Sequence, residues 1–340
     1  MIAPRVVSVI VPCRNECAHV DAFVAAALAQ ELPPGWALEL VVADGASDDG
    51  TRERLAALAA GEPRLRLVDN PARIVSAGLN RALAVARGDV IVRMDVHTAY
   101  AGDYVAQCFA ALERTGAANV GGPWRAEGQG PWGRAIAAAF ASRWAAGGAR
   151  SRSATYEGPV DTVYLGCWPR ATFRRFGTFD ETLVRNQDDE HNLRIVKGGG
   201  VVWQSPAIRS TYRPRESLGA FARQWLQYGY WKPFVARRHG QPAAWRHVVP
   251  GLAVVVVVAA LALALLGAGH GLLHAVVAGY GIVLAVLSAT AAGGIPLRLW
   301  WRLPVVIATQ HLAYAIGSLA GAWDAWRYGR GRERFARLTR

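Results

Sequence analysis

The stretch VVSVIVPCRNE, Val6–Glu16, decides the fold class of this chain. Its apolar part, Val6–Val11, is a nearly continuous β-branched run, which is typical of a strand buried on both faces of a parallel sheet. Polar residues follow as soon as the run ends. Two later stretches have the same form. LELVVADGASDDGT (Leu38–Thr51) ends in an acidic turn, and VIVRMDVHT (Val90–Thr98) ends in a second polar cluster.

Helical segments alternate with these strands. The pattern predicts strands over residues 6–11, 38–43, 65–68 and 90–94, and helices over residues 21–30, 51–60 and 74–86. This order predicts an α/β fold with a doubly wound, mostly parallel sheet. Ligands of such sheets bind outside the carboxyl ends of the strands, which is where Asp44 and Asp95 fall.

The three polar clusters therefore predict a nucleotide site at one sheet edge. Asp44 can accept a hydrogen bond from a base, and Glu16 can bind a ribose hydroxyl. Asp95 and His97 are two residues apart, and together they can approach a divalent cation that holds a diphosphate. The first strand is not followed by G-x-G-x-x-G, and the chain has no Walker A loop. These absences argue against a dinucleotide cofactor and against ATP hydrolysis.

Charge and hydropathy divide the chain at about residue 212. Residues 1–212 carry 23 Arg and Lys against 22 Asp and Glu, whereas residues 213–340 carry 15 against 3. The basic part is also the apolar part, since the 51 residues between Arg246 and Arg298 contain no charged side chain. This length accommodates two membrane spans of about 20 residues. The pattern indicates a membrane and its anionic headgroups rather than a nucleic acid.

We therefore expect four segments. Residues 1–212 form a cytosolic domain, 213–247 an interfacial amphipathic helix region, 248–326 a membrane region and 327–340 an Arg-rich tail. The expected spans are 250–267 and 272–292, with a possible third at 303–323. A third full span would place the tail outside, whereas the positive-inside rule places it in the cytosol. The sequence leaves this topology open.

The ordered set of motifs resembles the family 2 glycosyltransferases with a GT-A fold. It comprises VSVIVPCRNE (Val7–Glu16), VADGASDDGT (Val42–Thr51) and GLNRALAVARGDVIVRMDVHT (Gly78–Thr98). DTVYLGCWPRATFRRFGTFDETLVRNQDDEHNLRI (Asp161–Ile195) is similar to the acceptor half of that family. The resemblance covers roughly residues 5–232 and is nearest to the membrane-bound succinoglycan-biosynthesis glucosyltransferase group.

The resemblance implies roles for individual residues. The candidate nucleotide-sugar-binding residues are Pro12, Arg14, Glu16, Asp44, Asp95, Gly166 and Gln224. Asp188, in the place of the family's E-D motif, aligns with the catalytic base, and Asp189 is the alternative. The candidate metal ligands are Asp95 and His97, where D-x-H replaces D-x-D. An imidazole suits Mn²⁺ better than Mg²⁺, so a divalent metal is expected and its identity stays open.

The expected function is transfer of a sugar with inversion from a nucleotide-diphosphate sugar, with UDP-hexose favoured, to a polyprenyl-diphosphate-linked saccharide. The setting would be exopolysaccharide or envelope glycan synthesis at a bacterial cytoplasmic membrane, with the catalytic domain in the cytosol. Three alternatives remain: a polyprenyl-phosphate or glycerolipid glycosyltransferase, a processive polysaccharide synthase, and an inactive scaffold or sugar-nucleotide sensor. The family's Q-x-x-R-W motif here is QWLQY, Gln224–Tyr228, and its missing Arg counts against the synthase.

Overall fold

The computed structural model describes residues 5–145, 147–242, 244–332 and 335. The chain forms two compact units. The N-terminal unit comprises residues 1–125 and 154–212, and the C-terminal unit comprises residues 126–153 and 213–340. Residue 212, the expected end of the first domain, ends the N-terminal unit. The segment 126–153, which the sequence division left in the first domain, packs with the C-terminal helices instead.

An eight-stranded sheet is the centre of the N-terminal unit, with the order β3-β2-β1-β4-β9-β6-β10-β8. Its strands are β1 (Arg5–Cys13), β2 (Trp36–Asp44), β3 (Leu65–Asp69), β4 (Val90–Arg93), β6 (Asn119–Gly122), β8 (Gly158–Pro159), β9 (Tyr164–Pro169) and β10 (Val202–Gln204). The first four strands pair in parallel, as predicted. β9 runs antiparallel to both β4 and β6, while β10 pairs in parallel with β6.

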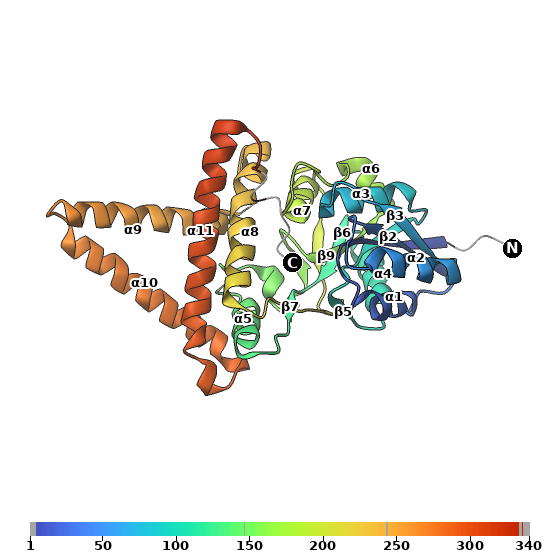
Figure 1. Cartoon of the computed structure of the whole chain (residues 1–340), viewed down its shortest axis with the longest axis horizontal. Coiled ribbons are helices and arrows are strands. Elements are labelled where there is room, and N and C mark those ends of the chain that lie inside the picture. The colour runs from blue at the N-terminus through green and yellow to red at the C-terminus, as the bar shows by residue number, and fades with distance from the viewer. Residues whose placement is uncertain (1–4, 146, 243, 333–334, 336–340) are drawn as a thin grey trace. The chain divides into compact units, whose positions relative to one another are not determined.

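Helices cover both faces of this sheet (Figure 1). They are α1 (Val20–Leu28), α2 (Thr51–Gly61), α3 (Val75–Val85), α4 (Tyr104–Thr115), α6 (Arg170–Phe176) and α7 (Gln187–Lys197). Successive residues of a strand point to opposite faces. Accordingly, Val9 belongs to a core with Phe23 and Tyr104, and Ile10 belongs to a second core with Leu79. Burial on both faces explains why β1 is a continuous apolar run rather than an alternating one.

A smaller sheet has the order β5-β11-β7. β5 (Thr98–Tyr100) begins three residues after Asp95 and pairs antiparallel with β11 (Ser210–Tyr212). The chain enters the C-terminal unit within β7 (Arg125–Ala126). This sheet thus pairs β5, which follows β4 in the chain, with β11, the last strand of the N-terminal unit.

The C-terminal unit is helical. Its helices are α5 (Pro131–Ala141), α8 (Leu218–His239), α9 (Val249–Leu265), α10 (His270–Ala291) and α11 (Arg302–Tyr328), and its short 3₁₀ turns are Arg150–Arg152, Trp245–His247, Ala292–Gly294 and Leu297–Leu299. The segment after α5 joins this unit through Ser142, whose hydroxyl lies 2.9 Å from that of Thr290. Phe140 of α5 packs edge-on against Phe221 of α8.

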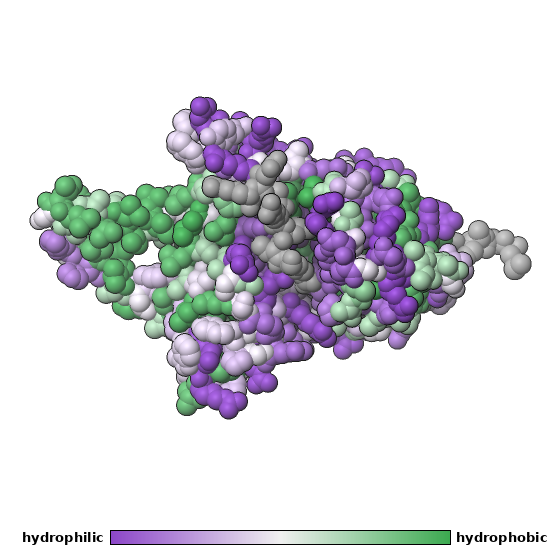
Figure 2. Space-filling view, viewed as in Figure 1, coloured by the Kyte–Doolittle hydropathy of each residue, from purple (hydrophilic) through white to green (hydrophobic). Residues whose placement is uncertain are grey.

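Two apolar stretches in this unit are long enough to cross a membrane, His270–Gly294 and Leu297–Tyr328. The first covers the expected span 272–292, and the second contains the possible third span, 303–323, within one uninterrupted helix. The expected span 250–267 corresponds to α9, which has 17 residues and a length of about 25 Å. Apolar side chains of α9 and α10 are exposed over most of both helices (Figure 2).

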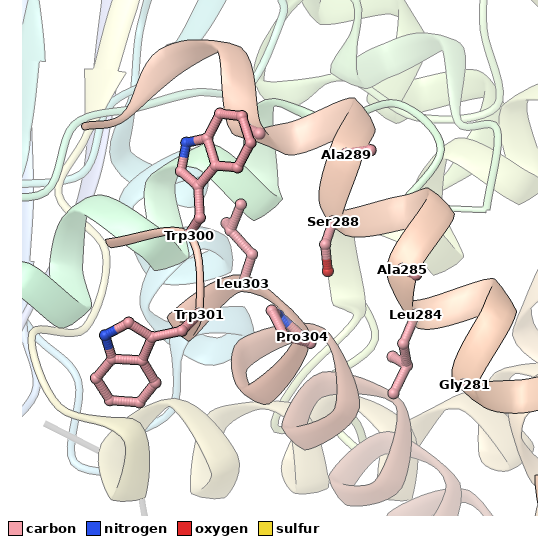
Figure 3. A pocket seen from close by; sticks show the side chains of 10 residues that line it. Gly281, Leu284, Ala285, Ser288, Ala289, Trp300, Trp301, Leu303 and Pro304 are labelled. Atoms are coloured by element: carbon pink, nitrogen blue, oxygen red, sulfur yellow. The ribbon is translucent and has the colours of Figure 1, made fainter. Parts of the chain in front are cut away.

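An apolar cavity of about 450 Å³ lies between α10 and the start of α11 (Figure 3). Its walls include Leu284 and Ala285 from α10, and Trp300, Leu303 and Pro304 from the other side. Among the described side chains that line it, only that of Ser288 carries a hydroxyl. Its chemistry therefore suits a hydrocarbon better than a polar ligand.

α8 and α11 pack along one another at glycines. A β-carbon on Gly321 of α11 would lie 2.0 Å from the carbonyl oxygen of Tyr230, and one on Gly317 would lie 2.1 Å from that of Leu226. On α8, a β-carbon on Gly229 would lie 2.1 Å from the carbonyl oxygen of Tyr314. Glycines four residues apart allow two helix backbones to approach this closely. This packing fixes one face of α8 against α11. The interfacial position expected for residues 213–247 stays a prediction.

Gly321→Leu is expected to force α8 and α11 apart, because the new side chain meets backbone rather than a movable side chain. Overpacking of this kind costs about 1–3 kcal/mol, so the apparent Tm of the detergent-solubilised protein should fall by about 2–12 °C. The matched control is Gly279→Leu in α10, where a β-carbon meets nothing within 4 Å. Equal thermal shifts in the two variants would contradict the close packing of α8 on α11.

Candidate active site

The loops that follow β1 and β2 are locked together by reciprocal hydrogen bonds. Asn15 donates from its side-chain amide to Asp48 Oδ1 (2.8 Å), and the Asp48 backbone N–H donates to Asn15 Oδ1 (3.1 Å). The backbone N–H of Asn15 donates to Ser47 Oγ (2.9 Å). Asn15 adopts a left-handed conformation, with φ of 54°, which Asn tolerates better than most residues. The two loops therefore form one rigid wall at the sheet edge.

Asp44 ends β2 inside this wall and is 1% exposed. Its carboxylate accepts from Ser47 Oγ (2.6 Å) and from the Ser47 backbone N–H (3.2 Å), and Arg52 NH1 lies 3.5 Å away. Arg14 packs beside it, since a β-carbon on Gly45 would lie 3.1 Å from Arg14 Cβ. Pro12, half-buried, is the penultimate residue of β1. The structure thus gathers the predicted residues of the first two clusters at one place.

Glu16 and His97 meet across the gap between the loops after β1 and β4. His97 Nδ1 lies 3.6 Å from Glu16 Oε1, and the Glu16 backbone N–H donates to Thr51 Oγ1 (2.8 Å). The sequence interpretation assigned these two side chains to different ligands, a ribose and a metal. Their proximity places both at the same end of the site.

Asp95 is held by Arg93, a residue that the sequence interpretation missed. Arg93 Nε and NH2 donate to the two oxygens of the Asp95 carboxylate, at 3.0 and 3.1 Å. Arg93 NH1 lies 3.9 Å from Asp188 Oδ2, so one guanidinium faces two carboxylates. Burial disfavours the charged guanidinium, but Asp95 and Asp188 outweigh this effect and raise the pKa of Arg93. Removing one partner from a buried ion pair costs about 3–5 kcal/mol in proteins.

The acidic cluster Asp188–Glu190 opens α7. Asp188 and Asp189 are partly exposed, and the Asp189 backbone N–H donates to Asp188 Oδ1 (2.9 Å). Glu190 is fully buried and accepts from Arg194 NH2 (2.8 Å). The first turn of a helix favours negative charge. Because Asp188 and Asp189 are partly exposed and Glu190 is buried, Asp188 and Asp189 are the accessible carboxylates of this turn, and Glu190 anchors the helix through Arg194.

Gly166 lies within β9 and is required there by packing. Its φ is +123°, and a β-carbon would lie 2.5 Å from the Trp168 ring and 2.8 Å from Asn119 Oδ1. Gln224 lies in α8 of the C-terminal unit, where it is buried and donates to the Tyr228 hydroxyl (3.3 Å). Roles for Gly166 and Gln224 in sugar binding stay predictions.

Aromatic rings form a wall beside His97. Trp124 stacks on Tyr164 with ring centroids 5.3 Å apart and planes 4° apart, and Tyr212 packs edge-on against both. The Tyr212 ring lies 6.0 Å from His97, and the Tyr164 hydroxyl lies 2.8 Å from Thr98 Oγ1. No spacing in the sequence points to this wall, because its members come from three separate segments.

The predicted metal ligands are not part of a larger ligand cluster. Within the described residues, no group of three or more His, Cys, Asp and Glu side chains could hold a metal ion. Asp95 and His97 retain 14% and 22% side-chain exposure. Cations that bind substrate phosphates need only one or two protein carboxylates. These residues therefore fit a cation shared with a diphosphate.

His191 anchors α7 from the opposite side. It is fully buried, stacks on Phe173 with centroids 5.2 Å apart, and its Nε2 lies 3.0 Å from the Gly177 carbonyl oxygen. Burial is the main cause that lowers the pKa of His191 from 6.5 to about 4. The ring is therefore neutral in the folded protein near pH 7.

The lowered pKa of His191 predicts acid sensitivity. Between about pH 6.5 and about pH 4 the unfolded chain binds a proton that the folded chain does not, so stability falls as the pH falls, by roughly 3 kcal/mol in total. His191→Phe removes this group. We expect the apparent Tm of His191→Phe to fall less between pH 7 and pH 4.5 than that of the wild type. Identical falls would show that His191 does not control the acid response.

Comparisons with known proteins identify the family of the chain. The family model "Glycosyl transferase family 2" matches residues 8–175. The chain is 30% identical over 315 residues to the succinoglycan biosynthesis protein ExoA of Rhizobium meliloti (strain 1021), which covers 91% of this chain and 92% of that protein.

Two further similarities are more distant. The chain is 35% identical over 60 residues to a protein of Methanococcus voltae, the dolichyl N-acetyl-alpha-D-glucosaminyl phosphate 3-beta-D-2,3-diacetamido-2,3-dideoxy-beta-D-glucuronosyltransferase. This match covers 18% of this chain and 19% of that protein. The fold of this chain is similar to that of the mannosyltransferase PcManGT from Pyrobaculum calidifontis, solved with GDP-Man and Mn²⁺. The TM-score is 0.61 at 20% identity, over 95% of this chain and 88% of the other. The chain therefore belongs to glycosyl transferase family 2 and is a glycosyltransferase with the GT-A fold.

Proposed function

We propose that this enzyme transfers one hexose from UDP, with inversion, to a lipid-linked saccharide at a bacterial cytoplasmic membrane. The observation that carries the proposal is the meeting of four carboxylates at one sheet edge. Asp44 and Glu16 lie in the loops after β2 and β1, and Asp95 follows β4. Asp188 reaches the same edge from α7, 3.9 Å from the guanidinium that holds Asp95.

The nucleotide is proposed to lie against the wall formed by the loops after β1 and β2. Asp44 would accept from the base and Glu16 from a ribose hydroxyl, with Pro12 and Arg14 bordering the same space. Gly166 is proposed to border the sugar, and a role for Gln224 in nucleotide-sugar binding stays a prediction. Pre-arranged hydrogen bonds such as those of Ser47 to Asp44 keep the carboxylate oriented before the donor arrives.

Asp188 is proposed to act as the general base. Its carboxylate would take the proton from the acceptor hydroxyl as that oxygen attacks the anomeric carbon. The attack comes from the face opposite the UDP leaving group, so the configuration at that carbon is inverted. Asp189 is the alternative base, because it is the other accessible carboxylate of the same turn.

Asp95 and His97 are proposed to hold a divalent cation together with the diphosphate. When bound, such a cation neutralises charge that develops on the departing diphosphate. Asp95 would orient the diphosphate, and His97 would complete the protein's share of the ligands. The mannosyltransferase of similar fold was solved in complex with Mn²⁺, which supports a cation of this class.

A membrane-bound acceptor is supported by the C-terminal unit and by the relatives. Two of its apolar helices are long enough to span a bilayer, and the cavity beside α10 suits a hydrocarbon chain. One relative is named for succinoglycan biosynthesis, and another for transfer to a dolichyl phosphate-linked sugar. We propose a multi-pass protein with the N-terminal unit in the cytosol, and contact between its basic segments and anionic lipid headgroups.

The proposed function is tested by assaying the purified, lipid-reconstituted chain with a panel of UDP- and GDP-sugars. Each donor is tested with Mn²⁺ or Mg²⁺, with and without a bacterial polyprenyl-linked saccharide extract. Transfer of one sugar to a lipid-extractable product supports the proposal. Transfer to plain polyprenyl phosphate, a long polymer, or nucleotide binding without any turnover would each replace it with a different function.

Asp188→Asn should abolish transfer while UDP binding is kept. An amide cannot accept the proton, and general-base catalysis contributes about 10²–10⁴-fold. The comparison is Asp189→Asn, which should retain most activity. Transfer rates and UDP titrations of both variants check this. Loss of UDP binding in Asp188→Asn, or a larger rate loss in Asp189→Asn, would contradict the role given to Asp188.

Chelation with EDTA should stop transfer, and added Mn²⁺ should restore it. His97→Asp replaces an imidazole with a carboxylate, which Mg²⁺ prefers. We therefore expect the ratio of Mg²⁺-supported to Mn²⁺-supported rate to rise severalfold in His97→Asp. Activity that survives EDTA, or an unchanged ratio in the variant, would contradict the proposal that Asp95 and His97 hold a catalytic divalent cation.

A further inference from the structure

Among the described residues of the site, Arg93 is the most buried cationic side chain, and its three guanidinium nitrogens differ in their hydrogen bonding. Its side chain is 7% exposed. Nε and NH2 are committed to the two Asp95 oxygens. NH1 is buried and, within the described part of the chain, makes no hydrogen bond. It faces Asp188 Oδ2 at 3.9 Å, which is an ion-pair distance but beyond hydrogen-bonding reach.

Arg93 lies between two elements of the fold that each carry one of its carboxylate partners. It is the last residue of β4, a strand at the middle of the sheet, so its backbone is rigidly held. Asp95 follows it on the donor side of the site. Asp188 belongs to α7, a different element on the acceptor side of the proposed reaction. One planar guanidinium therefore links the two halves of the site.

We propose that Arg93 is a positioning residue that sets the orientation and spacing of Asp95 and Asp188. This inference rests on the proposed function, because it takes Asp188 as the base. Bidentate pairing fixes the plane of the guanidinium against Asp95. The same plane directs NH1 toward Asp188. The acceptor oxygen activated by Asp188 is thereby aligned with the anomeric carbon of a donor whose diphosphate is oriented by Asp95.

The proposal predicts that charge alone is insufficient at this position. Lys carries the same charge on a single nitrogen and cannot form the planar fork. Arg93→Lys should therefore lower kcat about 10²-fold, as a misplacement of about 1 Å does in enzymes. The Kd for uridine, which lacks the diphosphate that Asp95 is proposed to orient, should change by less than about threefold, because Arg93 does not touch the proposed nucleotide wall.

The matched control is Arg194→Lys. Arg194 also holds a carboxylate in the first turn of α7, Glu190, but it contacts the carbonyl oxygens of Phe176 and Thr178 instead of β4. It thus supports α7 without linking it to Asp95. We expect Arg194→Lys to lower the apparent Tm and to leave kcat within about threefold of the wild type.

A double-mutant cycle separates positioning from general support of the fold. Arg93→Lys is combined with Asp188→Glu, which keeps a carboxylate but moves it. If Arg93 acts through Asp188, the combined loss in kcat should be at least about fivefold smaller than the product of the single losses. All variants are assayed with the donor and acceptor that the wild type uses. Absence of wild-type transfer would refute the proposed function before Arg93 is tested.

Three results would overturn the inference about Arg93 in an active enzyme. The first is a kcat of Arg93→Lys within about threefold of the wild type. The second is multiplicative losses in the cycle. The third is loss of UDP binding and folding in both Arg93→Lys and Arg93→Gln while Arg194→Lys folds, which would make Arg93 a residue of stability alone.

Discussion

The alignment of the parallel strands β3, β2, β1 and β4 is the constraint on which the site depends. Cys13 pairs with Asp44, and Asp44 pairs with Asp69, so β1, β2 and β3 end at the same level, while β4 ends at Arg93, which pairs with Ile10. Apart from Ser8, Glu39 and Arg66, their interior residues are apolar on both faces, and a slip by one residue would exchange the two cores. The hydrophobic effect therefore places the polar residues after β1, β2 and β4 at one edge, without any direct attraction among them.

Electrostatics then determines how these polar groups are arranged. The carboxylates at the edge would repel one another if they were left alone, and the structure pairs them with cations or donors. Asp44 is held by Ser47 and faces Arg52, and Asp95 is held by Arg93. Glu190 is paired with Arg194 and is withdrawn into the protein. The result is a site in which Asp188 and Asp189 stay accessible while their helix is anchored.

The sequence predicted the parallel half of the sheet well because each strand is a long apolar run that ends in a polar cluster. β9 was not recognised as an antiparallel strand, since Gly166 and the left-handed Leu165 interrupt its pattern. Arg93 was missed because it reads as one polar residue at the end of an apolar strand, and its partner in α7 is 95 positions away. The packing of residues 126–153 with the C-terminal helices likewise depends on long-range contacts. The Arg-rich tail falls partly at residues 333–334 and 336–340, outside the described residues.

The most direct measurement is an experimental structure of the full chain in lipid with UDP, Mn²⁺ and an unreactive donor analogue. The proposed function predicts that the uridine lies against the loops after β1 and β2, within hydrogen-bonding distance of Asp44 or Glu16. It also predicts that the diphosphate lies by Asp95, and that Asp188 lies on the face of the anomeric carbon opposite the diphosphate. Density for the nucleotide away from this edge, or Asp188 on the same face as the diphosphate, would contradict the proposed function.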